Sequence, residues 1–391
     1  MTPAARLQAA IEILDEVIAS ARDDGPPADV IVTRYFKSRR YAGSKDRRAV
    51  RELVFRAVRR SANPPESGRA AILGLAADEP ELLTHFGEVR GPGSVGEGET
   101  ATAASLVPAW LASELSPLVA AKEWPALLER APVDLRINAA RTSREAMLGE
   151  FAGAEATRIS PWGLRLPADS KVDDHPAFLE GLVEVQDEGS QLIALACQAK
   201  PEDGIIDLCA GAGGKALALA SASDNRAEII ACDTNRSRLS KLPPRAARAG
   251  AKIELRLLDG GREPEQLADL NAAADTVLVD APCSGSGTWR RNPEGRWRLS
   301  PDRLDRLIEQ QVHVLDLAEP LVKSGGRLVY AVCSLLSREG AGQISGFLSR
   351  HSSWMVEETP IKAGRLDGDG RLLTPGHDST DGFFVASLIR K

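Results

Sequence analysis

The sequence predicts an α/β protein with a doubly wound, Rossmann-like sheet in its carboxy-terminal half and a helical domain at its amino terminus. Three observations predict this class. From about residue 183 onward, short apolar segments alternate with helical ones, as in parallel strands joined by helices. A glycine-rich turn follows the first such segment, and acids follow the next three. Near the amino terminus, apolar residues instead recur at helical spacing.

Two apolar repeats predict helices in the amino-terminal part. Both place apolar side chains three or four positions apart, so that they share one face of a helix. Residues 86–108 are rich in glycine and weakly apolar, which predicts a long connecting loop. The two repeats consist of Leu7, Ile11, Leu14 and Ile18, and of Val50, Leu53, Val54 and Val58.

A small mixed segment is predicted between the two main parts. Helical signals return over residues 110–124. Residues 133–138 alternate as a strand does, and the run from Thr142 to Glu145 has the composition of a capped helix start. The expected domains are 1–105 (helical), 106–182 (connecting helices with a small α+β segment) and 183–391 (the sheet).

Six apolar segments of strand length fall in the last domain. Each is short, rich in aliphatic residues and bounded by turns or helical stretches, which fits a buried strand of a parallel sheet. The expected strands cover residues 205–208, 228–232, 253–258, 276–279, 327–331 and 383–389.

The composition predicts a cytoplasmic protein without a membrane segment. At 391 residues the chain is long enough for two or three packed domains. No apolar run approaches the roughly 18 residues of a membrane span. Five cysteines without disulfide-framework spacing fit a reducing compartment, and five scattered histidines without a CxxC pair predict no metal site. We expect a monomer.

Basic residues gather in one stretch of a chain whose net charge is −6. Residues 34–60 hold eleven Lys and Arg against two acids, Asp46 and Glu52, so the local net charge is +9. Such density is typical of a surface that binds polyanions, although a solvated helix face has the same composition. A second basic stretch favours nucleic-acid binding and consists of Arg290, Arg291, Arg296, Arg298, Arg303 and Arg306.

A glycine-rich turn after the first expected strand predicts a cofactor site. Its glycines let a ligand approach the backbone where a helix begins. A P-loop would need Ser or Thr at Ala216, so a kinase or NTPase is disfavoured, and a dinucleotide fold would need a third glycine there. The turn consists of Cys209, Ala210, Gly211, Ala212, Gly213, Gly214 and Lys215.

Three acids continue the pattern at the carboxyl ends of the following strands. Asp233 closes the second expected strand, Asp259 follows the third and Asp280 closes the fourth. Ligands of open α/β sheets bind at this edge, where carboxylates suit ribose hydroxyls and an adenine amino group. Acids at strand ends also cap loops, but three of them beside a glycine turn favour a nucleotide-like cofactor.

Two cysteines stand in tight loops after expected strands. Cys283 lies in the run Asp-Ala-Pro-Cys-Ser and Cys333 in the run Ala-Val-Cys-Ser. A partly exposed thiol in a positive field can act as a nucleophile, and Arg290 and Arg291 closely follow Cys283. The remaining cysteines fit buried apolar positions: Cys197, Cys209 and Cys232.

These motifs resemble those of the Sun/RsmB-type RNA (cytosine-5) methyltransferases, relatives of the NOP2/Sun proteins. The resemblance covers roughly residues 107–391. Residues 41–48 resemble more loosely the NusB-like RNA-binding domain of bacterial members. Ala212 stands where the family commonly has Pro, and Val332 where it has Thr. The matching segments are 135–138, 142–145, 185–191, 280–287, 329–334 and 381–386.

The resemblance implies methyl transfer from S-adenosylmethionine to carbon-5 of a cytidine in RNA, with 16S ribosomal RNA expected. It implies that residues 209–215 hold the cofactor, with Asp233 on the ribose, Asp259 near the adenine and Asp280 between cofactor and base. Cys333 is then the nucleophile that adds to carbon-6, and Cys283 assists its elimination. The base must leave its stack or lie in a single-stranded loop.

Three other functions stay open on the sequence. A DNA cytosine-5 methyltransferase also uses a Pro-Cys nucleophile, but a second cysteine such as Cys333 favours RNA. A transfer RNA methyltransferase would share every motif. A non-catalytic, RNA-binding ribosome assembly factor would keep the fold, although it would have no need of both cysteines, Lys215 and the strand-end acids.

Overall fold

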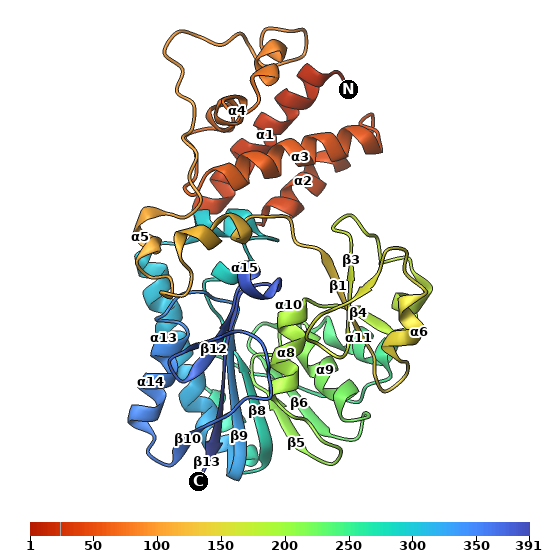
Figure 1. The fold of residues 1–391 in the computed structure, drawn as a ribbon, viewed down its shortest axis with the longest axis vertical. Coiled ribbons are helices and arrows are strands. Elements are labelled where there is room, and N and C mark those ends of the chain that lie inside the picture. The colour runs from red at the N-terminus through yellow and green to blue at the C-terminus, as the bar shows by residue number, and fades with distance from the viewer. Residues whose placement is uncertain (24) are drawn as a thin grey trace. The chain divides into compact units, whose positions relative to one another are not determined.

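The computed structural model describes residues 1–23 and 25–391, which divide into two compact units. Figure 1 shows helices and irregular segments in the amino-terminal part and a helix-flanked sheet in the carboxy-terminal part. Within the described residues, no helix combines the length and apolar character needed to cross a membrane. The first unit comprises Met1–Glu114, Ala121–Glu129 and Thr288–Pro301, and the second Leu115–Ala120, Arg130–Gly287 and Asp302–Lys391.

Four helices form the core of the first unit. They are α1 (Pro3–Arg22), α2 (Ala28–Lys37), α3 (Ser44–Arg60) and α4 (Gly68–Ala76). The hydroxyl of Thr2 caps α1 by accepting the N–H of Ala5 at 3.1 Å. The apolar positions expected to share a helix face are buried in α1 and α3, except for the half-buried Leu53. The helical prediction for this part is confirmed.

The chain after α4 is mostly irregular. All of residues 86–108 are described, and none of them lies in a helix or strand, as expected. The helix expected over residues 110–124 is wrong, because Pro117 lacks the N–H that a continuous helix needs and Leu115 pairs with Leu336 in an isolated β-bridge. The short helical elements after α4 are η1 (Pro80–His85), α5 (Ala109–Ala112), η2 (Ala121–Glu123) and η3 (Pro125–Leu127).

The first unit is completed by η6 (Pro293–Arg298), a 3-10 segment from far along the chain. Trp297 is buried with the helices and donates its indole N–H to the carbonyl of Ser61 at 2.8 Å. Arg296 donates to the carbonyl of Val58 at 2.7 Å, and burial lowers its pKa to about 9. Arg298 donates to the carbonyl of Gly25 at 2.9 Å. Arg296 and Arg298 of the second basic stretch therefore bind backbone carbonyls of the first unit.

The second unit opens with a small antiparallel sheet in the order β2-β3-β1-β4. The strand expected over residues 133–138 is β1, and Ser143 caps α6 by accepting the N–H of Ala146 at 3.2 Å. These elements are β1 (Val133–Ile137), α6 (Arg144–Leu148), β2 (Glu155–Ala156), β3 (Gly163–Leu166), α7 (Pro176–Leu179) and β4 (Val183–Val185).

A nine-stranded sheet forms the rest of the second unit, in the order β11-β12-β13-β9-β8-β5-β6-β7 with β10 beside β13. Its strands are β5 (Gly204–Asp207), β6 (Glu228–Asp233), β7 (Glu254–Leu257), β8 (Ala274–Asp280), β9 (Val322–Val332), β10 (Trp354–Glu357), β11 (Arg365–Asp367), β12 (Gly370–Leu373) and β13 (Phe383–Arg390). Strands β5 to β9 are parallel, whereas β13 pairs antiparallel with β9. The Rossmann-like α/β class is confirmed. The parallel direction expected for residues 383–389 is wrong, because β13 returns antiparallel to β12 through residues 374–382, a connection that is shorter than a parallel crossover needs.

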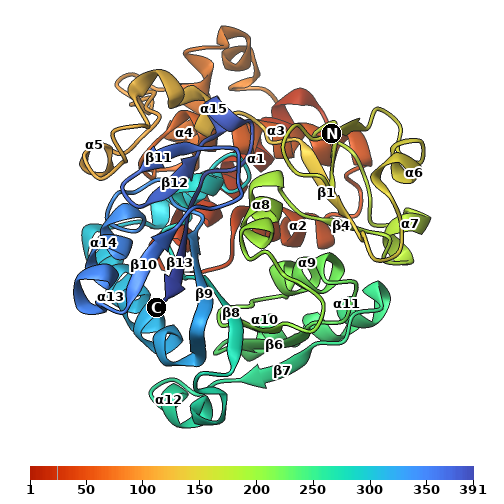
Figure 2. The same cartoon turned by 60° about the horizontal axis from the view of Figure 1, so that its bottom comes forward.

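Helices cover both faces of this sheet (Figure 2). On one face, side chains such as Ile229, Leu278 and Val329 pack with the helices that connect and precede the parallel strands. The other face is covered by the remaining helices, and buries Tyr330 against Phe384 in an edge-to-face ring contact. The first group comprises α8 (Glu188–Ala196), α9 (Gly214–Ala222), α10 (Arg236–Leu239) and α11 (Leu242–Ala249), and the second α13 (Pro301–Ala318) and α14 (Ala341–Arg350). The short helices α12 (Glu263–Gln266) and α15 (Pro375–Asp378), with the turns η4 (Ala268–Leu270), η5 (Ser286–Thr288) and η7 (Glu319–Leu321), complete the chain.

Candidate active site

The glycine-rich turn connects the end of β5 to the start of α9. Gly213 is the residue before the helix and has a φ of +80°, a left-handed conformation that side chains other than glycine rarely adopt. A Cβ there would also meet the side chain of Leu242 at 2.2 Å. Gly211 has a φ of +57°. The turn therefore leaves the first backbone N–H groups of α9 at the carboxyl edge of the sheet, as expected.

Asp233, at the end of β6, holds this turn in place. Its carboxylate accepts the N–H of Gly211 at 2.7 Å and the N–H of Asn235 at 2.6 Å. Asp259 lies two residues beyond the end of β7, is exposed, and accepts the side-chain amide of Gln266 at 3.1 Å. Both acids lie at the carboxyl edge of the sheet. Their assignment to ribose and adenine stays a prediction.

Asp207 is a further candidate for the site, and the sequence motifs had not pointed to it. It ends β5, is fully buried, and neither of its carboxylate oxygens makes a hydrogen bond of good geometry to any described residue. Burial and the charge of Asp280 raise the pKa of Asp207 to about 7. An acid at the end of the first expected strand, in series with Asp233 and Asp280, was the available signal.

Lys215 and Asp280 form an ion pair beside the turn. The Lys215 Nζ donates to the Asp280 carboxylate at 2.7 Å and lies 5.7 Å from the centre of the Phe383 ring. Burial lowers the pKa of Lys215, but the charge and hydrogen bond of Asp280 outweigh it, so that the pKa is raised. The structure thus joins one residue of the predicted cofactor loop to one predicted catalytic residue.

The two predicted catalytic cysteines lie together. Their Sγ atoms are 3.3 Å apart, and both side chains are half-buried. They follow neighbouring parallel strands, in which Asp280 of β8 lies opposite Ala331 of β9. The hydrogen bond that the Cys283 thiol makes to Cys333, and then burial, raise the pKa of Cys283 well above its usual value. Cys283 is therefore protonated at neutral pH, next to a second thiol.

The three other cysteines have the surroundings of apolar residues, as expected. Cys197 and Cys232 are buried, and Cys209 is half-buried. Burial raises the pKa of Cys232 to about 12, and it also raises the pKa of Cys197 and of Cys209. None of these thiols ionises readily near neutral pH.

The basic stretch of the first unit forms an exposed surface. Four of its arginines form ion pairs, for example Arg34 with Glu16 at 3.1 Å and Arg60 with Asp78 at 2.6 Å. Tyr41, which lies within the stretch, is 74% exposed. The exposed basic side chains, hereafter the basic surface, are Arg34, Lys37, Arg40, Lys45, Arg47, Arg48 and Arg51.

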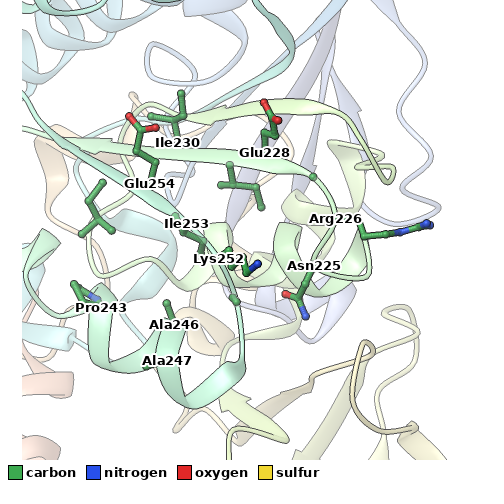
Figure 3. A pocket seen from close by; sticks show the side chains of 14 residues that line it. Asn225, Arg226, Glu228, Ile230, Pro243, Ala246, Ala247, Lys252, Ile253 and Glu254 are labelled. Atoms are coloured by element: carbon green, nitrogen blue, oxygen red, sulfur yellow. The ribbon is translucent and has the colours of Figure 1, made fainter.

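A separate surface pocket of about 790 Å³ lies between the starts of β6 and β7 and helix α11 (Figure 3). Its lining carries both charges, with Arg226 and Lys252 alongside Glu228 and Glu254. It stands at the amino ends of the strands, the opposite edge of the sheet from the glycine turn. This pocket is therefore not the predicted cofactor site.

Comparisons with known proteins agree on one family. The family profile described as 16S rRNA methyltransferase RsmB/F matches residues 193–389. Ribosomal RNA small subunit methyltransferase B of Salmonella arizonae is 35% identical over 303 residues, covering 75% of this chain and 69% of that relative. The chain belongs to this family. As an RsmB/F protein it is an S-adenosylmethionine-dependent RNA methyltransferase.

Solved structures agree on the fold. PH0851 aligns with a TM-score of 0.79 at 23% identity, covering 100% of this chain and 99% of that one. NSun6 from Pyrococcus horikoshii, solved with SFG, an analogue of S-adenosylmethionine, has a TM-score of 0.62 at 22% identity and covers 69% of this chain and 93% of that one. At these identities the likeness concerns the fold alone.

The residues present fit S-adenosylmethionine. The cofactor carries an amino group and a sulfonium, both positive, and the buried Asp207 carboxylate next to the turn makes no hydrogen bond of good geometry to a described residue, so its oxygens can accept from a ligand. The left-handed Gly211 and Gly213 keep the turn free of side chains. The role of each predicted residue in binding the cofactor stays a prediction. Asp207 joins the residues predicted to contact it.

Proposed function

We propose that this RsmB/F protein methylates carbon-5 of a cytidine in 16S ribosomal RNA through a covalent adduct with Cys333. One observation carries the proposal: two thiols 3.3 Å apart, at the ends of neighbouring strands, on the same edge of the sheet as the Lys215–Asp280 pair. A single nucleophile would need only one of these thiols. Two thiols in contact suit a reaction in which one adds and the other assists its departure.

The first step forms the adduct. Carbon-5 of cytosine is a weak nucleophile, so the Cys333 thiolate adds to carbon-6 and the displaced electron pair moves toward carbon-5. S-adenosylmethionine supplies the methyl group that carbon-5 then takes up. Asp280, ion-paired with Lys215, is the acceptor that would hold the pairing edge of the base in this orientation.

The second step releases the product. A base removes the proton from carbon-5, and the electron pair of that carbon–hydrogen bond forms the double bond between carbon-5 and carbon-6. The carbon–sulfur bond breaks at the same time and leaves its electron pair on the Cys333 sulfur. The protonated Cys283 lies in hydrogen-bond contact with Cys333 and can give its proton to the departing sulfur. This contact supports Cys333 as the nucleophile and Cys283 as the proton donor that assists elimination.

The basic surface supports RNA as the substrate. Seven exposed Lys and Arg side chains over α2 and α3 suit contacts to phosphates, and the exposed Tyr41 offers a face on which a base can stack. We further propose that the protein works as a monomer in the cytoplasm, where ribosomal RNA is assembled, with residues 1–105 as an RNA-binding domain.

The deciding experiment is bisulfite sequencing of total RNA from a deletion strain and from the strain complemented with the wild-type or the Cys333→Ala gene. We expect one cytidine of 16S RNA to lose protection in the deletion strain and to regain it only with the wild-type gene. If a cytidine of transfer RNA lost protection instead, transfer RNA would be the substrate. Full protection of every cytidine in every strain would refute the proposal.

A further inference from the structure

A buried carboxylate joins the two cysteine loops. Glu339 ends the turn that follows Cys333 and stands just before α14. It is 0% exposed, although Arg338 beside it in the chain is exposed. A carboxylate is seldom buried without a specific set of hydrogen-bond donors, because its desolvation costs several kcal/mol.

The donors to Glu339 come from both loops. Its Oε1 accepts the backbone N–H of Ser284 at 2.8 Å, and its Oε2 accepts the hydroxyls of Ser284 and Ser334. Ser284 follows Cys283 in the chain, and Ser334 follows Cys333. One carboxylate therefore binds the residue next to each sulfur.

Two further contacts fix this carboxylate and the Cys283 loop. Gln311 of α13 donates its side-chain amide to Oε1 of Glu339 at 2.9 Å and to the carbonyl of Pro282 at 3.0 Å. Cys283 is thus held on both sides, at Pro282 and at Ser284. The hydroxyl of Tyr330 in β9 donates to the backbone carbonyl of Glu339 at 2.7 Å. The network ties the carboxylate to the strand that carries Cys333.

The carboxylate also acts through its charge. The pKa of Cys283 is raised first by its hydrogen bond to Cys333 and by burial, and then by the charges of Cys333 and Glu339. A negative charge held near Cys283 disfavours a thiolate at that sulfur.

We propose that Glu339 is a positioning residue, whose carboxylate sets the relative position of Cys283 and Cys333 by binding the serine that follows each. The inference rests on the proposed function in one respect, namely that both sulfur atoms react at the same cytosine base. The relative position of the two sulfur atoms can be measured with neither RNA nor cofactor present, so the two proposals can fail separately.

Oxidation by diamide measures this position. Diamide takes two hydrogens from a pair of neighbouring thiols, which become a disulfide while the reagent becomes the hydrazine, so the rate of disulfide formation reports their proximity. The variant is Glu339→Gln, which keeps the size but replaces an acceptor oxygen with a donor group. The matched control is Glu309→Gln, an exposed position on α13. Peptide mass spectrometry identifies the Cys283–Cys333 disulfide.

We expect Glu339→Gln to form the disulfide about tenfold more slowly and to lose kcat for methyl transfer by a similar factor, because small displacements of reacting groups have large effects. Its KM for RNA and its calorimetric affinity for S-adenosylmethionine should stay within about twofold of wild type, as expected for a group that contacts neither ligand. Glu309→Gln should match wild type in every measurement.

An unchanged disulfide rate in folded Glu339→Gln overturns the proposal. If that variant does not fold, Ser334→Ala removes a single hydroxyl from the network and should slow the disulfide in the same direction, and an unchanged rate there overturns it equally. Slower disulfide formation together with a wild-type protein that methylates no cytidine would support the positioning role and refute the proposed function.

Discussion

The backbone N–H of Gly382 donates to the carbonyl oxygen of Gly287 at 2.8 Å, which connects the loop of Cys283 to the start of β13. The two backbones approach so closely that a Cβ on Gly287 would lie 2.0 Å from the Gly382 carbonyl oxygen. The N–H of Gly287 also donates to the carbonyl of Cys333 at 3.0 Å. These glycines let three segments meet at the two thiols.

Gly287→Ala should therefore displace the Cys283 loop and lower the free energy of unfolding by about 1–3 kcal/mol, the usual cost of overpacking. Chemical denaturation of the holoprotein measures the change. Gly260→Ala is the control, since a Cβ there meets nothing within 4 Å. Equal stability of the two variants would show that the contact can relax at little cost.

The two cysteines should differ in what they trap. Cys333→Ala cannot add to carbon-6, so it should form no covalent RNA adduct even with a fluorinated cytidine. Cys283→Ala keeps the nucleophile but lacks the neighbouring proton donor, so with cofactor and ordinary RNA it should accumulate a denaturation-resistant complex. Denaturing gels of each variant give the answer. Trapping by Cys333→Ala instead would make Cys283 the nucleophile.

Asp233→Ala should lower the affinity for S-adenosylmethionine by about 1–3 kcal/mol, because it leaves the N–H groups of Gly211 and Asn235 without their acceptor. RNA affinity should hardly change. Calorimetry measures the cofactor affinity of Asp233→Ala and of a control, Asp369→Ala, which changes an exposed acid between β11 and β12. Normal cofactor affinity in the folded variant would remove Asp233 from the site.

Asp207→Asn should change how stability depends on pH. Because the pKa of Asp207 is raised in the folded protein from 3.8 to about 7, its contribution is fully present below pH 3.8 and is lost as pH rises through about 7. The Tm of Asp207→Asn relative to wild type should therefore rise between pH 5 and pH 8. Asp224→Asn, at an exposed position, should follow the wild-type curve. Parallel curves for Asp207→Asn would mean that this carboxylate titrates normally.

Changing Arg40, Lys45, Arg48 and Arg51 to Gln should weaken RNA binding and reduce its salt slope by about 1 for each phosphate contact removed. Cofactor affinity should not change. The control replaces Lys200, Arg226 and Lys252, which lie at the amino edge of the sheet. Substitution is preferable to deletion of residues 1–105, since deletion would uncover Trp297. An unchanged slope would show that the basic surface is only a solvated face.

Local patterns predicted the parts of the fold that local chemistry determines. The apolar faces of α1 and α3 and the strands β5, β6 and β8 followed from periodicity, and the glycine turn followed from its composition. The direction of β13 did not, because a strand's sequence does not state which neighbour it will pair with. The small strands β10 to β12 were missed because three or four residues are too few for a strand pattern to be recognised.

The site residues that could be predicted are those at equivalent positions, just at or after the carboxyl ends of parallel strands. Asp233 and Asp280 end successive strands, and Cys283 and Cys333 follow neighbouring ones, so topology alone brings them to one edge. Glu339 does not occupy such a strand-end position. Its hydrogen bonds come from loops and from α13, so no sequence pattern pointed to it. Arg296 and Arg298 were misjudged because a run of arginines has the same composition whether it faces solvent or binds buried carbonyls.

The attachment of η6 to the amino-terminal helices has a consequence for synthesis of the chain. Trp297 and Arg296 complete the core of a unit whose helices are made earlier, yet they are made only after strands β5 to β8 of the large sheet. Domains usually fold one after another as they emerge. Here the final packing of helices α1 to α4 requires η6. Translation therefore has to pass residue 298 before the helices that carry the basic surface can pack completely.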